Sequence, residues 1–223
     1  NLIDNLSPFL PTNEVAARIA KREFAQAVGV PIEQVGAYYI SPCAAETTHV
    51  RNPLGIKKSE LDGVFASRDV YARVISLMGK VEKKQSAAAM FPSGAFGLGA
   101  AVVGGFSAAV GTEHYLAADG IYSIIQCLEE IENERLRDLQ LFEGMACSGG
   151  CIGGPLNFEN QFVAKNRNRR IAYSQPRVEL ETDEHILKYL DSSLIRFEQQ
   201  VKPHDILKLS DDVVEAARMT ERL

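Results

Sequence analysis

The sequence predicts an α/β fold, and the alternation of two kinds of segment indicates that class. Short segments rich in β-branched and aromatic residues alternate along it with longer segments whose apolar residues recur at helical spacing. Such alternation is typical of sheets flanked by helices. Apolar residues make up 46% of the 223 residues, which is a globular level. A chain of this length buries a sizeable core, in one large domain or in two lobes.

The expected elements run in order from the N-terminus. Residues 1–10 form a short helical turn, and Thr12 caps a helix over residues 13–28. Strands are expected at 34–40, 62–66, 115–118 and 139–142, with helices at 68–81 and 121–135. The glycine-rich stretch 87–111 is expected to let a helix or loop approach another backbone closely. Residues 177–184 are a charged linker, and residues 184–200 and 210–223 are two amphipathic helices. We therefore expect one domain over residues 1–170 and a linker with C-terminal helices over 171–223.

Composition excludes several classes of function. The chain has 24 basic and 29 acidic residues, formally −5, which argues against a general nucleic-acid surface. The longest apolar run, residues 87–110, is broken by Pro92 and by glycines, so no membrane span is expected. No hydrolase motif is present. Without a signal peptide the expected location is cytoplasmic. The chain opens at Asn1 in mid-element, so we expect it to be a piece of a longer protein.

The most informative segment is 143–155, Glu-Gly-Met-Ala-Cys-Ser-Gly-Gly-Cys-Ile-Gly-Gly-Pro. Glycines allow positive φ and close approach to a bulky group. Thiolates of Cys147 and Cys151 on such a loop can face one soft centre, either zinc or an iron–sulfur cluster. Two buried cysteines or a surface disulfide would give the same spacing, but disulfides are rare in the cytosol. The segment, hereafter the cradle, is predicted to hold a metal.

Three residues outside the cradle bear on this prediction. Cys43 follows a proline at the end of an expected strand, where α/β folds keep their sites, although a lone cysteine is also commonly structural. His49 is available as a fourth zinc ligand beside Cys43, Cys147 and Cys151. Cys127 falls near the apolar stripe of a helix and is expected in the core. Four basic residues in 165–170 indicate a solvated strip or, alternatively, a docking patch for an acidic electron-transfer partner or for phosphate.

Several segments of the chain together resemble a known family. Residues 41–45 (Ser-Pro-Cys-Ala-Ala) and the cradle are similar to the second and third cluster-binding motifs of the diiron (iron-only) hydrogenases. Residues 1–8 resemble the segment after that family's first cysteine motif, and 62–69 and 93–94 follow in the family's order. The resemblance covers about residues 1–165.

The resemblance implies a set of roles. Cys43 and Cys147 ligate a 4Fe–4S cluster, and Cys151 ligates it and bridges to a diiron subsite. Met145 lines the diiron pocket and Ser7 matches a serine of the proton path. The cofactor would lie in a cleft between two α/β lobes with mixed or parallel sheets. The electron partner would be a ferredoxin-like or fused iron–sulfur domain. Oligomeric state is not implied.

This sequence also departs from the family. The first cysteine motif would lie before Asn1, so the matched positions supply three thiolates where a 4Fe–4S cluster usually has four. Ser41 replaces a methionine, and Glu46 replaces a lysine that hydrogen-bonds a cyanide on iron. An ionised carboxylate would repel that cyanide. These departures favour a divergent, sensory branch, with enzymatic hydrogen activation conditional on the upstream motif and the diiron subsite. Two alternatives stay open: a 4Fe–4S redox-sensing or electron-relay module, and a structural zinc domain.

Overall fold

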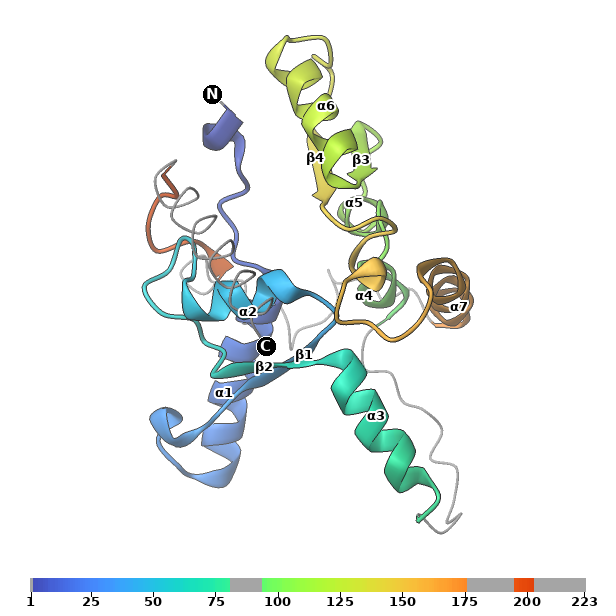
Figure 1. Ribbon diagram of the computed structural model, residues 1–223. Helices are drawn as coiled ribbons and strands as arrows, with labels where there is room; N and C mark the ends of the chain where they lie inside the picture. The colour runs from blue at the N-terminus through green and yellow to red at the C-terminus, as the bar shows by residue number, and fades with distance from the viewer. Residues whose placement is uncertain (1, 81–93, 176–194, 203–223) are drawn as a thin grey trace, which may run out of the picture. The chain divides into compact units, whose positions relative to one another are not determined.

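The computed structural model describes residues 2–80, 94–175 and 195–202 (Figure 1). The chain divides into two compact units. Unit 1 combines residues 1–65 with residues 181–223, and unit 2 is the continuous stretch 66–180. Both contain helices and a two-stranded sheet, so the α/β class is confirmed. The cleft expected between lobes stays a prediction, and each unit is described by itself.

Unit 1 opens with the 3₁₀ turn η1 (Leu2–Asn5) and the long helix α1 (Thr12–Val28). The sequence suggested that Thr12 is the N-cap, but Thr12 is the first residue of the helix. Pro11 is the cap instead, and its carbonyl accepts the amides of Glu14 and Val15 at 3.0 and 3.2 Å. A proline with φ of −52° and ψ of 143° is well suited to this position, because the first helical amides need an acceptor just upstream. Gly29 ends the helix in the left-handed region, with φ of 74°.

The first sheet of the chain follows α1. The 3₁₀ turn η2 (Ile32–Gln34) precedes strand β1 (Tyr38–Ser41), helix α2 (Ala44–Arg51) and strand β2 (Gly63–Ala66), and β1 pairs with β2. The predicted strand 34–40 is therefore wrong over its first half. Pro31 starts a helical turn that places the amides of Gln34 and Val35 on the carbonyls of Pro31 and Ile32, so the strand can begin only later.

Residues 196–200 are extended or bent, and the helix expected over 184–200 is wrong there. Arg196 forms an antiparallel bridge with Phe9. The amide of Phe197 donates to the carbonyl of Pro8 at 2.9 Å, and that of Leu10 to the carbonyl of Ile195 at 2.8 Å. Residues 195–198 (Ile-Arg-Phe-Glu) alternate between apolar and polar, which is the strand period. The remainder of that helix, the 177–184 linker and the helix at 210–223 lie outside the described residues.

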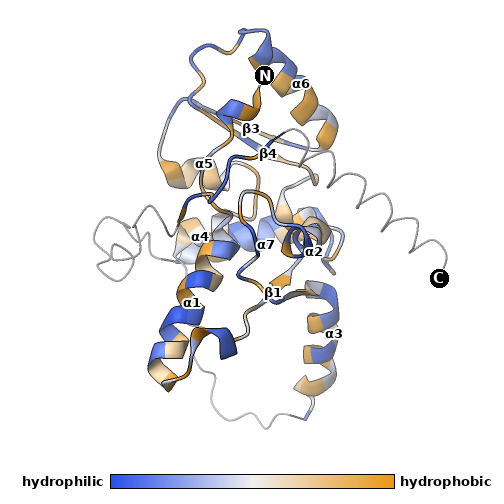
Figure 2. Cartoon of the chain, turned by 90° about the vertical axis from the view of Figure 1, so that its left-hand side faces the viewer, coloured by the Kyte–Doolittle hydropathy of each residue, from blue (hydrophilic) through white to orange (hydrophobic). Residues whose placement is uncertain are grey.

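Unit 2 is built on a βαβ arrangement. Strands β3 (Tyr115–Asp119) and β4 (Leu141–Met145) run parallel, in a register that starts with Tyr115 beside Leu141 and ends with Asp119 beside Met145. Helix α6 (Ile121–Glu132) connects them and packs on both. Strand β4 starts two residues later than predicted and runs on to Met145, so it leads directly into the cradle. Figure 2 shows hydrophobic and hydrophilic residues alternating along α6, as its predicted amphipathic pattern requires.

The other helices of unit 2 are α3 (Ser67–Met78), α4 (Ala95–Gly99), α5 (Gly105–Val110) and α7 (Gln161–Ser174). The expected close backbone approach in the glycine-rich stretch is confirmed at Gly105, where an added Cβ would lie 1.9 Å from the Gly99 carbonyl oxygen. Helix α7 carries the basic strip 165–170, and the predicted domain boundary at 170 falls inside it. No helix in the described part of the chain has the length and apolar character to cross a membrane.

Candidate metal centre

The cradle is a tightly wound loop between β4 and the 3₁₀ turn η3 (Cys151–Gly153). Gly149 and Gly150 have φ values of +86° and +90°, a region that side chains disfavour. A Cβ at Gly150 would lie 2.7 Å from Met145 Sδ and 2.8 Å from the Ala101 carbonyl oxygen. The loop therefore needs glycine for its backbone angles and for space, as the sequence predicted.

Asp119 fixes one side of the cradle. It ends β3, beside Met145 in the parallel register, and its Oδ2 accepts a hydrogen bond from the amide of Gly149. Residues connecting α4 and α5 fix the other side: Val102 bridges to Gly150, and the amide of Ile152 donates to the Ala101 carbonyl at 3.3 Å. The carboxyl end of a parallel strand thus holds the loop, which is the usual place for a site in α/β folds.

Glu143 anchors the strand that delivers the cradle. Its carboxylate is 8% exposed and accepts three hydrogen bonds from the start of α5. The donors are the Gly104 amide at 3.0 Å, the Ser107 amide at 2.8 Å and the Ser107 hydroxyl at 2.7 Å. A buried carboxylate with three donors is well compensated for its lost hydration. Strand β4 is thereby tied to α5 four residues before Cys147.

The thiols of the cradle suit a soft metal centre. Cys147 is half-buried and Cys151 is exposed, and no disulfide joins any of the four cysteines, all of which are described. Two thiols on one glycine-wound loop are the donor set that iron–sulfur clusters and zinc prefer, so Cys147 and Cys151 would hold such a group. Within the described ranges no three His, Cys, Asp or Glu side chains gather to hold a metal ion.

Cys43 belongs to unit 1, where it caps the N-terminus of α2. Its amide donates to Ser41 Oγ at 3.0 Å, and Ser41 is 1% exposed. Ser41 therefore shapes the turn that presents the Cys43 thiol. The structure brings Cys147 and Cys151 together on one loop, while Cys43 lies in the separately described unit.

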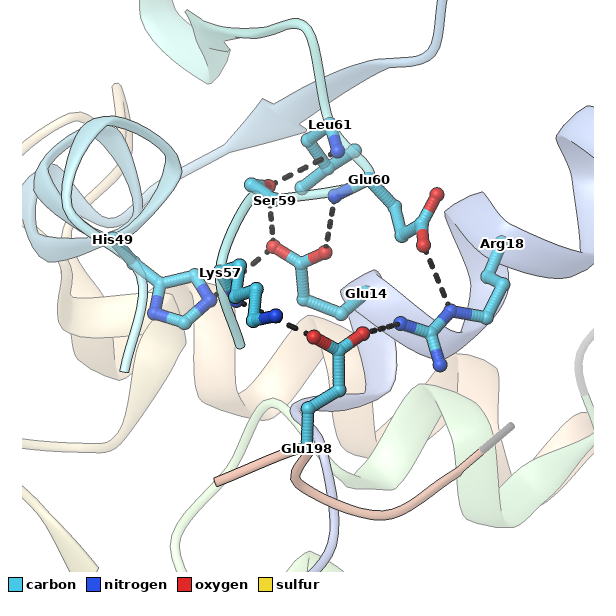
Figure 3. A network of polar contacts seen from close by, with 8 residues as sticks. All are labelled: Glu14, Arg18, His49, Lys57, Ser59, Glu60, Leu61 and Glu198. Atoms are coloured by element: carbon cyan, nitrogen blue, oxygen red, sulfur yellow. Dashed lines mark hydrogen bonds and ion pairs between the residues drawn. The ribbon is translucent and has the colours of Figure 1, made fainter. Parts of the chain in front are cut away.

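A second polar cluster, centred on Glu14 of α1, lies within unit 1 (Figure 3). Glu14 is 0% exposed; its Oε1 accepts from Ser59 Oγ at 2.5 Å and its Oε2 from the Glu60 amide at 2.8 Å. His49 Nε2 lies 3.2 Å from Glu14 Oε1, within ion-pair distance, although the ring N–H is not aimed closely enough at the oxygen to count as a hydrogen bond.

Charged neighbours surround this cluster. Arg18, one turn along α1, contacts Glu60 at 2.9 Å and Glu198 at 3.6 Å. Burial by itself would raise the pKa of Glu14, but the contact with His49 and the hydrogen bonds from Ser59 and the Glu60 amide outweigh it and hold that pKa below its ordinary value. Glu14 is therefore ionised at neutral pH.

The other residues named from the sequence are placed as follows. Glu46 lies in the first turn of α2 and accepts a hydrogen bond from Asn13 Nδ2 at 2.5 Å. Met145 ends β4 and is half-buried beside Gly150. Ser7 is exposed after η1, and Cys127 is half-buried within α6.

Sequence reasoning missed Asp119 and Glu14 as site-supporting residues. Asp119 carried a usable signal, because an acidic residue followed by glycine at the end of an apolar strand marks a strand-to-loop junction. Glu14 carried none: an acidic residue in the first helical turn is ordinarily solvated and stabilised by the helix dipole.

The fold and the cradle define the class of protein, an α/β protein with a glycine-wound loop that carries two cysteines at the end of a parallel strand. A comparison with family profiles identifies the family within this class. The profile of the iron-only hydrogenase large subunit, C-terminal domain, matches residues 1–155, and the chain belongs to this family. A search of curated proteins gives no match.

Proposed function

We propose that this chain is the cluster-binding part of a hydrogenase-like iron–sulfur protein that senses hydrogen or redox state. Cys43, Cys147 and Cys151 would hold a 4Fe–4S cluster, and Cys151 would also meet a diiron subsite. The observation that supports this most is the cradle, because its two thiols lie on a loop whose backbone angles and tight packing require glycine. The bound group would supply one-electron transfer and, with a diiron subsite, hydrogen activation.

The chain's own residues supply positioning. Asp119 and Glu143 hold the cradle in place, and Met145, at the junction of strand and loop, would line the diiron pocket. Ser7 would pass protons, and a ferredoxin-like or fused iron–sulfur domain would exchange electrons with the cluster. We favour sensing over turnover because Glu46 stands where the resemblance implies a lysine. Its carboxylate accepts a hydrogen bond from Asn13. It lacks the positive charge and the donors with which a lysine would bind a cyanide.

Anaerobic reconstitution of the full-length protein tests the proposal. Bound iron and sulfide in equal amounts, lost in Cys43→Ser, Cys147→Ser and Cys151→Ser, are the expected result. The matched control is Cys127→Ser, which should leave the metal content unchanged. Zinc without sulfide, or iron retained in all three ligand variants, would contradict the proposal. Infrared bands of iron-bound carbon monoxide and cyanide would establish the diiron subsite.

A second candidate is a 4Fe–4S relay without the diiron subsite, and the engaged carboxylate of Glu46 favours it. The same reconstitution separates the two, since a relay would carry the cluster and give no such infrared bands. A zinc site using His49 has less support, because the Nε2 atom of His49 already faces the buried Glu14 carboxylate.

A further inference from the structure

Helix α2 has little apolar packing to fix its orientation. It begins directly after Cys43, and none of its eight residues, Ala44–Arg51, is buried. Most of its side chains are small, so they offer few contacts of the kind that orient a helix in a core. Its orientation must therefore depend largely on polar contacts.

Two consecutive residues of α1 supply those contacts. Asn13 Nδ2 donates to Glu46 Oε2 at 2.5 Å, and Glu14 Oε1 lies 3.2 Å from His49 Nε2. Glu46 and His49 are three residues apart, so they lie on the same face of α2. Contacts one turn apart on one face restrain both the rotation of the helix about its axis and its position along that axis.

Glu14 is a firm anchor because it is itself immobilised. The Ser59 hydroxyl and the Glu60 amide both donate to its carboxylate, and Ser59 Oγ in turn accepts from the Leu61 amide at 3.0 Å. Figure 3 shows His49 and the 59–61 segment converging on Glu14. Moving a buried carboxylate away from such donors is costly, because each donor would be left unsatisfied.

We propose that Glu14 and His49 are positioning residues for Cys43: they set the orientation of α2 and, through it, the direction of the thiol at the helix N-cap. On its other side the amide of Cys43 donates a hydrogen bond to Ser41 Oγ. Loss of the Glu14–His49 contact would release one end of this arrangement and expose the thiol more often. The inference rests on the proposed function, in which Cys43 holds the cluster.

The rate at which iodoacetamide alkylates Cys43 in the metal-free protein tests this, at one fixed pH and read by peptide mass spectrometry. Cys127 in α6 is the internal reference. His49→Leu should raise the Cys43 rate about ten-fold, because losing one polar partner of the buried Glu14 carboxylate costs roughly a factor of ten in an opening equilibrium. His49→Gln keeps a polar N–H group beside the Glu14 carboxylate and should stay close to the wild-type rate.

The reconstituted protein gives the second readout. His49→Leu should shift the electron paramagnetic resonance signal of the reduced cluster and hasten cluster loss to a chelator, and His49→Gln should restore both. The proposal fails if His49→Leu alkylates at the wild-type rate, or if His49→Leu and His49→Gln raise the rate equally. If the wild-type protein assembles no cluster, the proposed function fails, while the alkylation ratio still decides whether His49 positions Cys43.

Discussion

Replacing Glu143 by glutamine should loosen the attachment of the cradle strand to α5. The carboxylate accepts three hydrogen bonds at 2.7–3.0 Å while 8% exposed. Glutamine is neutral and has only one acceptor oxygen. Whichever way its side-chain amide is turned, the NH₂ group therefore faces at least one of the backbone N–H donors. Losing one hydrogen bond to a buried charged acceptor costs about 2–3 kcal/mol, which corresponds to roughly a 30- to 150-fold rise in local opening.

Amide hydrogen exchange measured by NMR reads this opening directly. The Gly104 and Ser107 amides should lose protection by that factor in Glu143→Gln and by more in Glu143→Ala. Ser107→Ala, which removes one donor, should cost only about 1 kcal/mol. Glu113→Gln, at an exposed carboxylate of the same unit, is the control. Unchanged protection of both amides in Glu143→Gln would refute the role of Glu143 as their acceptor.

Three further predictions concern the cysteines, the second motif and pH. The 223-residue chain, reconstituted anaerobically, should bind substoichiometric iron and sulfide, because the family match supplies three thiolates; a full, stable 4Fe–4S complement would mean that another residue is the fourth ligand. In the full-length protein, Glu46→Lys should strengthen retention of a supplied diiron cofactor and shift its cyanide stretching bands; no change in either would place this side chain away from the cofactor. The pKa of Glu14 in the folded protein is below its ordinary value of 4.5, so its stabilising contribution is complete above pH 4.5 and is lost as the pH falls through the folded pKa. Glu14→Gln should therefore reduce the loss of unit 1 stability at acid pH, measured by hydrogen exchange. An unchanged dependence on acid pH would contradict this assignment.

Much of the fold could be predicted from local pattern. Strand β3 and helix α6 were expected nearly where they occur, because their apolar spacing is regular and glycine separates them. The cradle was found for the same reason, since its glycines and cysteines are adjacent in sequence. By contrast, the pairing of Arg196 with Phe9 joins residues far apart in the chain, and helical composition upstream concealed the alternation that begins at Ile195. The burial of Glu14 was equally invisible, because its donors come from segments that only the tertiary fold brings to α1.

The composition of unit 1 from two distant stretches has a consequence for biosynthesis. The amides of Glu198 and Gln199 donate to the Gly55 carbonyl at 2.7 and 3.1 Å, across more than 140 positions of chain. On the ribosome these hydrogen bonds have to wait until all of unit 2 has been made, whereas unit 2 is contiguous and has every one of its residues available earlier. The half of the molecule that carries Cys43 is therefore the last to be completed. During that interval Arg18 of α1 lacks its contact with the Glu198 carboxylate.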